Sequence, residues 1–264
     1  MRVDTTGLPA DNWHHFLRLR DLRQVLAEVP LANVPLHGVK RVLELGAGDG
    51  VQTAALREVF DEVIPMDIAP SGVVDGLVVA DAANLPFVDG YFDLVFSSNV
   101  LEHVERLDES LAEMKRVLAP EGIMIHSMPT GTWKVLQVVG RPVASLMRVL
   151  RKLVPGMSGG AERARPGSHA SVHVADPVRR SMVRRVIGLV IPTVHGVSGN
   201  HVSEFYRFRP AWWKRQFARA GLDCYRSSPL FSHSPYDLAP YRLMGLRDLI
   251  GRAGFASVDV FWLK

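Results

Sequence analysis

The sequence predicts an α/β fold, built on a mostly parallel β-sheet with helices on both faces. Short apolar runs alternate with helix-forming segments between residues 40 and 128, a pattern typical of βαβ units with right-handed crossovers. The chain has 264 residues, 47% of them hydrophobic, which is enough to bury the core of one α/β domain with insertions. Both observations favour a folded domain over a disordered chain.

The first predicted elements are a helix, a buried strand and a glycine-rich turn. An amphipathic helix is expected over residues 13–29. The apolar run 42–45 is followed by glycines at 46, 48 and 50, and then by helix formers from Val51 onward. Glycines let a ligand approach the backbone closely, and the N–H groups of a helix start favour an anionic group. We therefore expect a ligand site at the end of this strand.

Further strands and helices follow in order. Strands are predicted at 62–67, at 77–82 and within the segment 92–104, with a turn at 118–122 that leads into a fifth strand. The helix predicted between the fourth and fifth strands has an apolar stripe that faces the core, formed by Leu107, Leu111, Met114 and Leu118. A later helix starts at Pro210 and ends near Gly221. Two closing strands, 223–231 and 256–263, flank a predicted helix at 240–252.

Residues 131–200 interrupt this alternation and are strongly basic. Between 141 and 190 there are ten Lys and Arg residues against two acidic ones, a net charge of +8, whereas the whole chain carries +4. Two amphipathic helices are predicted here, one over 139–154 and one from Asp176 to 190. A helical cap with a solvated arginine face, an anionic membrane surface and an anionic substrate all remain open. Nucleic acid is disfavoured because no aromatic residues interleave with these charges.

These motifs follow one another in the same order as in class I S-adenosylmethionine-dependent methyltransferases, and the chain resembles the type 11 methyltransferases in particular. The resemblance rests on the G-x-G-x-G turn after Glu44, Asp67 at the end of the second strand, and the segment 99–104 after the fourth strand. It covers residues 38–130 closely. It implies a Rossmann-like sheet of seven strands with the last strand antiparallel, and S-adenosylmethionine at the carboxyl ends of strands 1 and 4. The amphipathic helices of residues 131–200 are expected to form a helical cap over the acceptor pocket.

The resemblance also implies a role for individual residues at the cofactor site. Asp67 would bind the ribose hydroxyls, Ile68 would lie against the adenine, and Asp81 would accept from the adenine amino group. The alternatives are an exposed loop carboxylate for Asp67 and a helix N-cap for Asp81. The complete predicted cofactor set is Glu44, Gly46, Ala47, Gly48, Asp67, Ile68, Asp81, Ala82 and Asn99.

A catalytic base is needed only when the methyl acceptor is a hydroxyl or a protonated amine. His103 and His201 are the candidates, with helix packing and a surface loop as the respective alternatives. The other candidate bases are His126, His195 and Glu204. No metal is expected, because the ten histidines form no H-E-x-x-H motif and there is no paired-cysteine motif.

The predicted function is methyl transfer from S-adenosylmethionine to a small-molecule, glycan or lipid-linked acceptor, with oxygen slightly favoured as the acceptor atom. The alternative is a non-catalytic regulatory protein that binds S-adenosylmethionine. An NAD-dependent reductase is disfavoured, because it would need G-x-G-x-x-G and a Tyr-x-x-x-Lys pair. The expected parts are an N-terminal helix and cofactor core (1–130), a basic cap (131–200) and the end of the core sheet (201–264).

The composition also predicts a location for the protein. Cys224 is the only cysteine, which favours a reducing compartment. No apolar run approaches the ~20 residues that cross a bilayer. We therefore expect a cytoplasmic protein, with peripheral contact at the inner membrane face through 141–190 as an open alternative.

Overall fold

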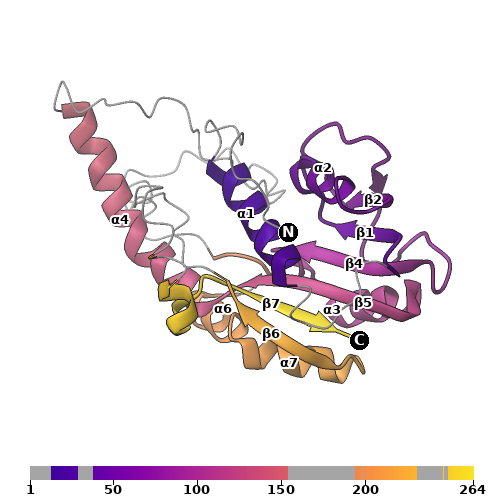
Figure 1. The fold of residues 1–264 in the computed structure, drawn as a ribbon. Helices are drawn as coiled ribbons and strands as arrows, with labels where there is room; N and C mark the ends of the chain where they lie inside the picture. Colours follow the sequence, from indigo (N-terminus) through magenta and orange to yellow (C-terminus); the bar gives the residue numbers. More distant parts are fainter. Residues whose placement is uncertain (1–12, 29–37, 154–193, 198, 231–245, 247–248) are drawn as a thin grey trace.

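The computed structural model describes residues 13–28, 38–153, 194–197, 199–230, 246 and 249–264 (Figure 1). Seven strands form one sheet in the order β3-β2-β1-β4-β5-β7-β6. The strands are β1 Arg41–Leu45, β2 Glu62–Asp67, β3 Val78–Val79, β4 Phe92–Ser98, β5 Leu118–Pro129, β6 Cys224–Pro229 and β7 Val258–Leu263.

The helices are α1 Trp13–Glu28, α2 Val51–Arg57, α3 Leu107–Val117, α4 Gly131–Leu153, α6 His201–Arg207 and α7 Pro210–Arg219. A 3₁₀ turn, η3, spans Leu101–His103, and a π-helical segment, η5, spans Gly251–Phe255. The predicted start of α7 at Pro210 is confirmed, and Gly221 just beyond its end has a φ of +69°.

The pairing of the strands confirms the predicted topology. β1 is parallel to β2 and β4, β2 is parallel to β3, and β4 is parallel to β5. β7 lies between β5 and β6 and is antiparallel to both. The order reverses between β1 and β4, so the crossovers leave a crevice at the carboxyl ends of these two strands.

Helices cover both faces of the sheet, as Figure 1 shows. On one face, Leu22 and Val25 of α1 and Leu56 of α2 pack with strand residues such as Val42. On the other face, α3 and α7 pack against the opposite side chains of the same strands, with the fully buried Phe217 as an example. The central strands are apolar on both sides because both faces are covered.

Two predicted elements differ from the structure in their bounds. The third strand is only Val78–Val79, because the chain turns at Asp81, whose carboxylate accepts from the Ala83 N–H and whose carbonyl accepts from the Asn84 N–H. The predicted turn at 118–122 is a local irregularity inside β5, which already pairs with β4 at Leu118.

The predicted cap is described only in part. α4 begins at Gly131, earlier than the expected start at 139, and Figure 1 shows it extending away from the sheet. The predicted helix from Asp176 to 190 and most of the one at 240–252 lie outside the described residues. Among the helices that the structure describes, none has the length and apolar character needed to span a bilayer.

Candidate functional site

The glycine turn after β1 has a backbone that only glycine adopts easily. Gly46, Gly48 and Gly50 all have positive φ, at +74°, +61° and +79°. A side chain at Gly46 would also collide with Val100, which follows β4. The Gly46 N–H donates to the carbonyl of Met66 at 2.8 Å and thereby fixes the turn against the end of β2.

Asp67 lies beside this turn with its carboxylate oriented by two backbone donors. Oδ2 accepts from the Gly48 N–H at 2.8 Å, and Oδ1 accepts from the Ala69 N–H at 2.8 Å. Each oxygen keeps a further lone pair for a ligand hydroxyl. The adjacent Ile68 is 67% exposed, so an apolar side chain lies open next to the carboxylate. Both groups match the chemistry of an adenosine.

Asp81 caps a turn, and not the helix N-terminus that was the alternative to adenine binding. Its Oδ1 accepts from the Ala83 N–H at 2.9 Å, and its Oδ2 forms an ion pair with Arg106 at 2.8 Å. The Ala83 hydrogen bond and then Arg106 lower the pKa of this carboxyl. The Ala80 N–H donates to the Asp67 carbonyl at 3.3 Å, which joins the loop before Asp81 and Ala82 to the end of β2.

Glu44 is a buried carboxyl group with one oxygen left without a donor. Its Oε2 accepts from the Thr53 hydroxyl, whereas Oε1 has no hydrogen-bond partner among the described residues. Burial raises the pKa of Glu44 to about 7, although the Thr53 hydrogen bond and the charges of Arg18 and Arg57 oppose this shift. A buried acceptor without a donor costs about 1–3 kcal/mol. The residues therefore fit a ligand with an ammonium group, such as the methionine end of S-adenosylmethionine.

Helix α1 adds residues that the sequence analysis did not include. His15 Nε2 lies 2.7 Å from Asp49 Oδ2, and Arg18 Nη1 donates to Asp49 Oδ1 at 3.1 Å. Arg18 also donates to Gln52 at the start of α2, at 3.2 Å. These contacts place a guanidinium group beside the glycine turn, close to Gly48. They join positions more than thirty residues apart, so no local motif predicts them.

Asn99 ends β4 in a left-handed conformation, with a φ of +53°. Asparagine tolerates this region better than most residues. Its N–H donates to the Ser127 carbonyl at 2.9 Å, which holds the end of β4 beside β5. The chain then enters η3 directly, and this turn places Glu102 and His103 just beyond the carboxyl end of β4.

The candidate bases occupy three separate environments. His126 is fully buried within β5, 2.8 Å from the Ser97 hydroxyl, and burial lowers its pKa to about 3. This neutral imidazole packs near Phe217 and fits a core role better than a catalytic one. His201 Nδ1 lies 3.6 Å from Glu204, which forms an ion pair with Lys134.

His103 has a different neighbour. Its Nε2 lies 3.1 Å from Nε2 of His195, and the two rings meet edge to face. Burial lowers the pKa of His103, the Glu102 carboxylate opposes this shift, and the nearby His195 adds to it. The structure therefore brings His103 together with His195, and it brings His201 together with Glu204.

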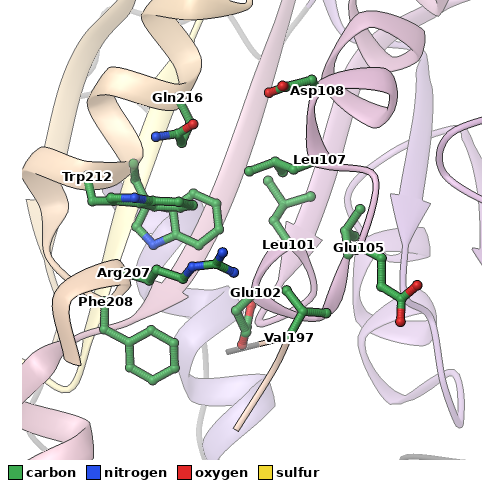
Figure 2. Close-up of a pocket in the computed structure, with 12 residues that line it drawn as sticks. Leu101, Glu102, Glu105, Leu107, Asp108, Val197, Arg207, Phe208, Trp212 and Gln216 are labelled. Carbon is green, nitrogen blue, oxygen red and sulfur yellow. The ribbon is translucent and has the colours of Figure 1, made fainter. Parts of the chain in front are cut away.

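A pocket opens next to η3, with a volume of about 200 Å³ (Figure 2). One wall comes from the segment after β4, including Leu101 and Glu102, and the other from α6 and α7. Figure 2 shows Arg207 and Trp212 facing the η3 side. The full lining is Leu101, Glu102, Val104, Glu105, Leu107, Asp108, Val197, Arg207, Phe208, Trp212, Trp213 and Gln216.

Residues 43–126 match the family model described as a methyltransferase domain. This stretch contains the last residues of β1, the glycine turn, Asp67 and η3. Over residues 43–126 the chain therefore carries a methyltransferase domain, and S-adenosylmethionine is the methyl donor of this kind of domain.

Curated relatives are similar to about a third of the chain. It is 38% identical over 100 residues to a malonyl-[acyl-carrier protein] O-methyltransferase from Methylococcus capsulatus, covering 33% of this chain and 36% of that protein. It is 35% identical over 103 residues to a demethylmenaquinone methyltransferase from Beutenbergia cavernae, covering 36% and 43%. The matched stretch thus spans less than half the length of these relatives.

A solved S-adenosylmethionine-dependent methyltransferase from Mesorhizobium loti is similar over 90% of this chain and 97% of its own, with 17% identity and a TM-score of 0.48.

Proposed function

We propose that this protein transfers a methyl group from S-adenosylmethionine to a small-molecule, glycan or lipid-linked acceptor, with a hydroxyl oxygen as the favoured acceptor atom. The observation that carries the proposal is the place of the pocket in Figure 2. It begins at Leu101, just beyond Asn99 at the carboxyl end of β4, where this fold binds its cofactor.

The chemistry asks little of the protein beyond alignment. S-adenosylmethionine supplies an activated methyl group on a sulfonium, and a bond from the acceptor oxygen to that carbon replaces the carbon–sulfur bond. S-adenosylhomocysteine leaves as a neutral thioether, and the acceptor proton passes to a base or to water. Holding donor and acceptor in line is therefore the main contribution of the site.

The lining of the pocket supports a small acceptor or the reactive end of a larger one. Phe208 and Trp212 supply aromatic surface, and Arg207 supplies a cation that lies 5.6 Å from the Trp212 ring. A volume of about 200 Å³ suits one ring or a short chain. Apolar walls with a few polar groups are typical of small-molecule sites.

The basic insertion would then supply acceptor specificity. α4 starts directly after β5, at the edge of the sheet where the cofactor would lie, and Val139 and Val143 on this helix are exposed. Trp133 of α4 packs against His195 at 4.9 Å, next to the pocket. Contact of residues 141–190 with an anionic membrane stays an open prediction, because most of these residues lie outside the described part of the chain.

The test measures release of S-adenosylhomocysteine over a panel of hydroxylated acids, phenols, glycans and lipid-linked acceptors. With an accepted substrate, Arg207→Ala is expected to lower kcat/KM at least tenfold, about 1.4 kcal/mol, because a charged contact in the pocket is lost. Affinity for S-adenosylmethionine should stay unchanged. Arg219→Ala is the matched control, because Arg219 is exposed at the end of α7 and does not line the pocket.

Two results would contradict the proposal. Cofactor binding with no transfer to any panel member would favour a non-catalytic binding protein. Equal kinetics for Arg207→Ala and the control would place the acceptor somewhere other than this pocket.

A further inference from the structure

Three potential metal ligands converge at the edge of the pocket. Glu102 and His103 come from η3, and His195 comes from the segment before α6. His195 is 92 positions after His103 in the chain. The two Nε2 atoms are 3.1 Å apart. Oε1 of Glu102 lies 3.9 Å from the His103 Nε2 and 3.7 Å from the His195 Nε2.

These three distances define a place for an ion. A circle through the three ligand atoms has a radius of about 2.1 Å, so a point in their plane lies at that distance from each atom. Zinc bonds to imidazole nitrogen at about 2.0–2.1 Å and to carboxylate oxygen at about 2.0–2.2 Å. The ligand atoms therefore already have the separation that a first-row metal ion requires.

The carboxylate of Glu102 lacks a compensating donor within the protein. Its side chain is only 2% exposed, and neither oxygen has a hydrogen-bond partner in the described part of the chain. The imidazoles of His195 and His103 lie 3.7 and 3.9 Å from its Oε1. A buried carboxylate without donors is costly, whereas coordination of a cation satisfies it.

The backbone holds the two segments in this arrangement. The Val197 N–H donates to the Glu102 carbonyl at 3.0 Å. Gly196 has a φ of +69°, and a side chain there would collide with the same carbonyl. Trp133 covers the ring of His195 with a centroid distance of 4.9 Å. These contacts fix His195 next to η3 without any help from a ligand, as a preformed metal site requires.

We propose that Glu102, His103 and His195 bind one divalent first-row transition metal ion, with Zn²⁺ as the representative. Two imidazoles and one carboxylate suit Zn²⁺, Co²⁺ or Fe²⁺ and disfavour Mg²⁺ and Ca²⁺, which prefer oxygen ligands. Three protein ligands leave coordination positions open, as in catalytic rather than structural sites. Glu102 also lines the pocket, so an open position lies within reach of an acceptor.

The role of the ion rests on the proposed function and narrows its acceptor class. A metal ion lowers the pKa of a hydroxyl that binds to it, so the hydroxyl loses its proton to water before the methyl group is transferred. The protein then needs no histidine as the base. The acceptors implied are those with a hydroxyl and a second oxygen that can share the ion, such as hydroxy acids and catechols.

Local spacing does not reveal this site, which is why the sequence analysis expects no metal. Glu102 and His103 are adjacent, and the third ligand arrives only through the packing of residues 194–197 on η3. Motifs such as H-E-x-x-H place all their ligands on one element.

The experiment titrates the full, tag-free chain with Co²⁺ after treatment with a chelator, and follows the visible absorption of bound Co²⁺. One equivalent is expected to bind, and Zn²⁺ is expected to displace it, whereas Mg²⁺ is not. His195→Ala and Glu102→Gln should each weaken binding at least tenfold, because the first removes one ligand and the second replaces an anionic carboxylate with a neutral amide. His201→Ala is the matched control, because its imidazole also lies near a buried glutamate but outside this cluster.

Calorimetric binding of S-adenosylmethionine by each variant checks that its fold is retained. Absence of Co²⁺ and Zn²⁺ binding to the original chain would overturn the proposal, as would equal binding by His195→Ala and His201→Ala. Metal binding is measured without an acceptor, so failure of the methyl-transfer proposal remains distinguishable. Transfer to a catechol that is unchanged after chelation would overturn the role of the ion in the reaction.

Discussion

At the scale of single residues, the carboxyl ends of β1 and β2 carry two carboxylates with opposite environments. Asp67 accepts two backbone hydrogen bonds and remains partly open to solvent. Glu44 is 1% exposed and has one oxygen without a donor in the described part of the chain. Asp67 is therefore ready to accept ligand hydroxyls, whereas Glu44 is held at a cost that a cationic ligand group would offset.

The environment of Glu44 predicts a pH dependence of stability. Burial raises its pKa from 4.5 to about 7, so the folded state holds a proton that the unfolded state has released between these pH values. The free energy of unfolding should therefore fall as pH rises through this range, by at most about 1.4 kcal/mol per pH unit. Glu44→Gln removes this contribution, because the amide does not titrate. The amide oxygen of the glutamine can still accept the hydrogen bond from Thr53.

Urea unfolding at pH 5 and pH 8 measures the effect. Relative to the original chain, Glu44→Gln should gain about 2–3 kcal/mol of stability between the two pH values. Asp259, whose pKa burial raises to about 6, titrates in both proteins and cancels in the difference. The exposed Glu58→Gln is the control. Parallel stability curves for Glu44→Gln and the original chain would show that Glu44 does not titrate in this way.

The residues that sequence could predict are those that lie in local motifs. Glu44, Gly46 and Asp67 are found because strand ends and glycine turns have a fixed spacing along the chain. Arg18 and His195 reach the site only through the packing of α1 and of residues 194–197, so no spacing indicates them. Asp81 has a suitable position in the motif, but its two oxygens already bind Ala83 and Arg106.

At the scale of elements, α4 and α6 are joined by a buried ion pair. Lys134 Nζ lies 2.6 Å from Glu204 Oε2, and the two side chains are 3% and 0% exposed. Lys134 also donates to Gln137 at 2.8 Å. The pair connects the first helix of the insertion to the segment that carries the second pocket wall.

Removing one member of this pair should leave the other charge buried and unpaired. Lys134→Met is expected to cost about 3–5 kcal/mol of unfolding free energy, and the double variant Lys134→Met/Glu204→Leu should recover much of that loss. Denaturant titration of both single variants and the double variant measures the coupling. Glu109→Ala is the control, because its ion pair with Arg106 is exposed to solvent and contributes little to stability.

The outcome that contradicts this role is simple additivity. If the double variant loses as much as the two single variants together, the pair does not couple α4 to α6.

The elements differ in how well sequence predicts them, for physical reasons. β1, β2 and β4 are apolar runs bounded by turns, and they form where expected. β3 is shorter because Asp81 caps a turn, which an apolar run cannot reveal. The apolar pattern also does not predict the early start of α4 at Gly131, because the buried positions of its first turns include the polar Lys134 and Gln137.

At the scale of the whole molecule, the proposed cofactor site and the pocket meet at the carboxyl ends of β1 and β4. The sheet order brings the glycine turn, Asp67 and η3 to this edge from separate parts of the sequence. α6 and α7 return from the far end of the chain to close the pocket. The central claim is therefore that this edge binds S-adenosylmethionine in a specific orientation.

Calorimetric titration with S-adenosylmethionine, S-adenosylhomocysteine and NAD tests that claim most directly. We predict that the first two bind and NAD does not, and that Asp67→Ala weakens binding by about 1–3 kcal/mol because a charged acceptor is lost. Asp67→Asn, which keeps one acceptor oxygen, should lose less. Asp61→Asn, at the exposed opposite end of β2, should lose nothing. Undiminished affinity in Asp67→Ala, or tighter binding of NAD than of S-adenosylmethionine, would contradict the account.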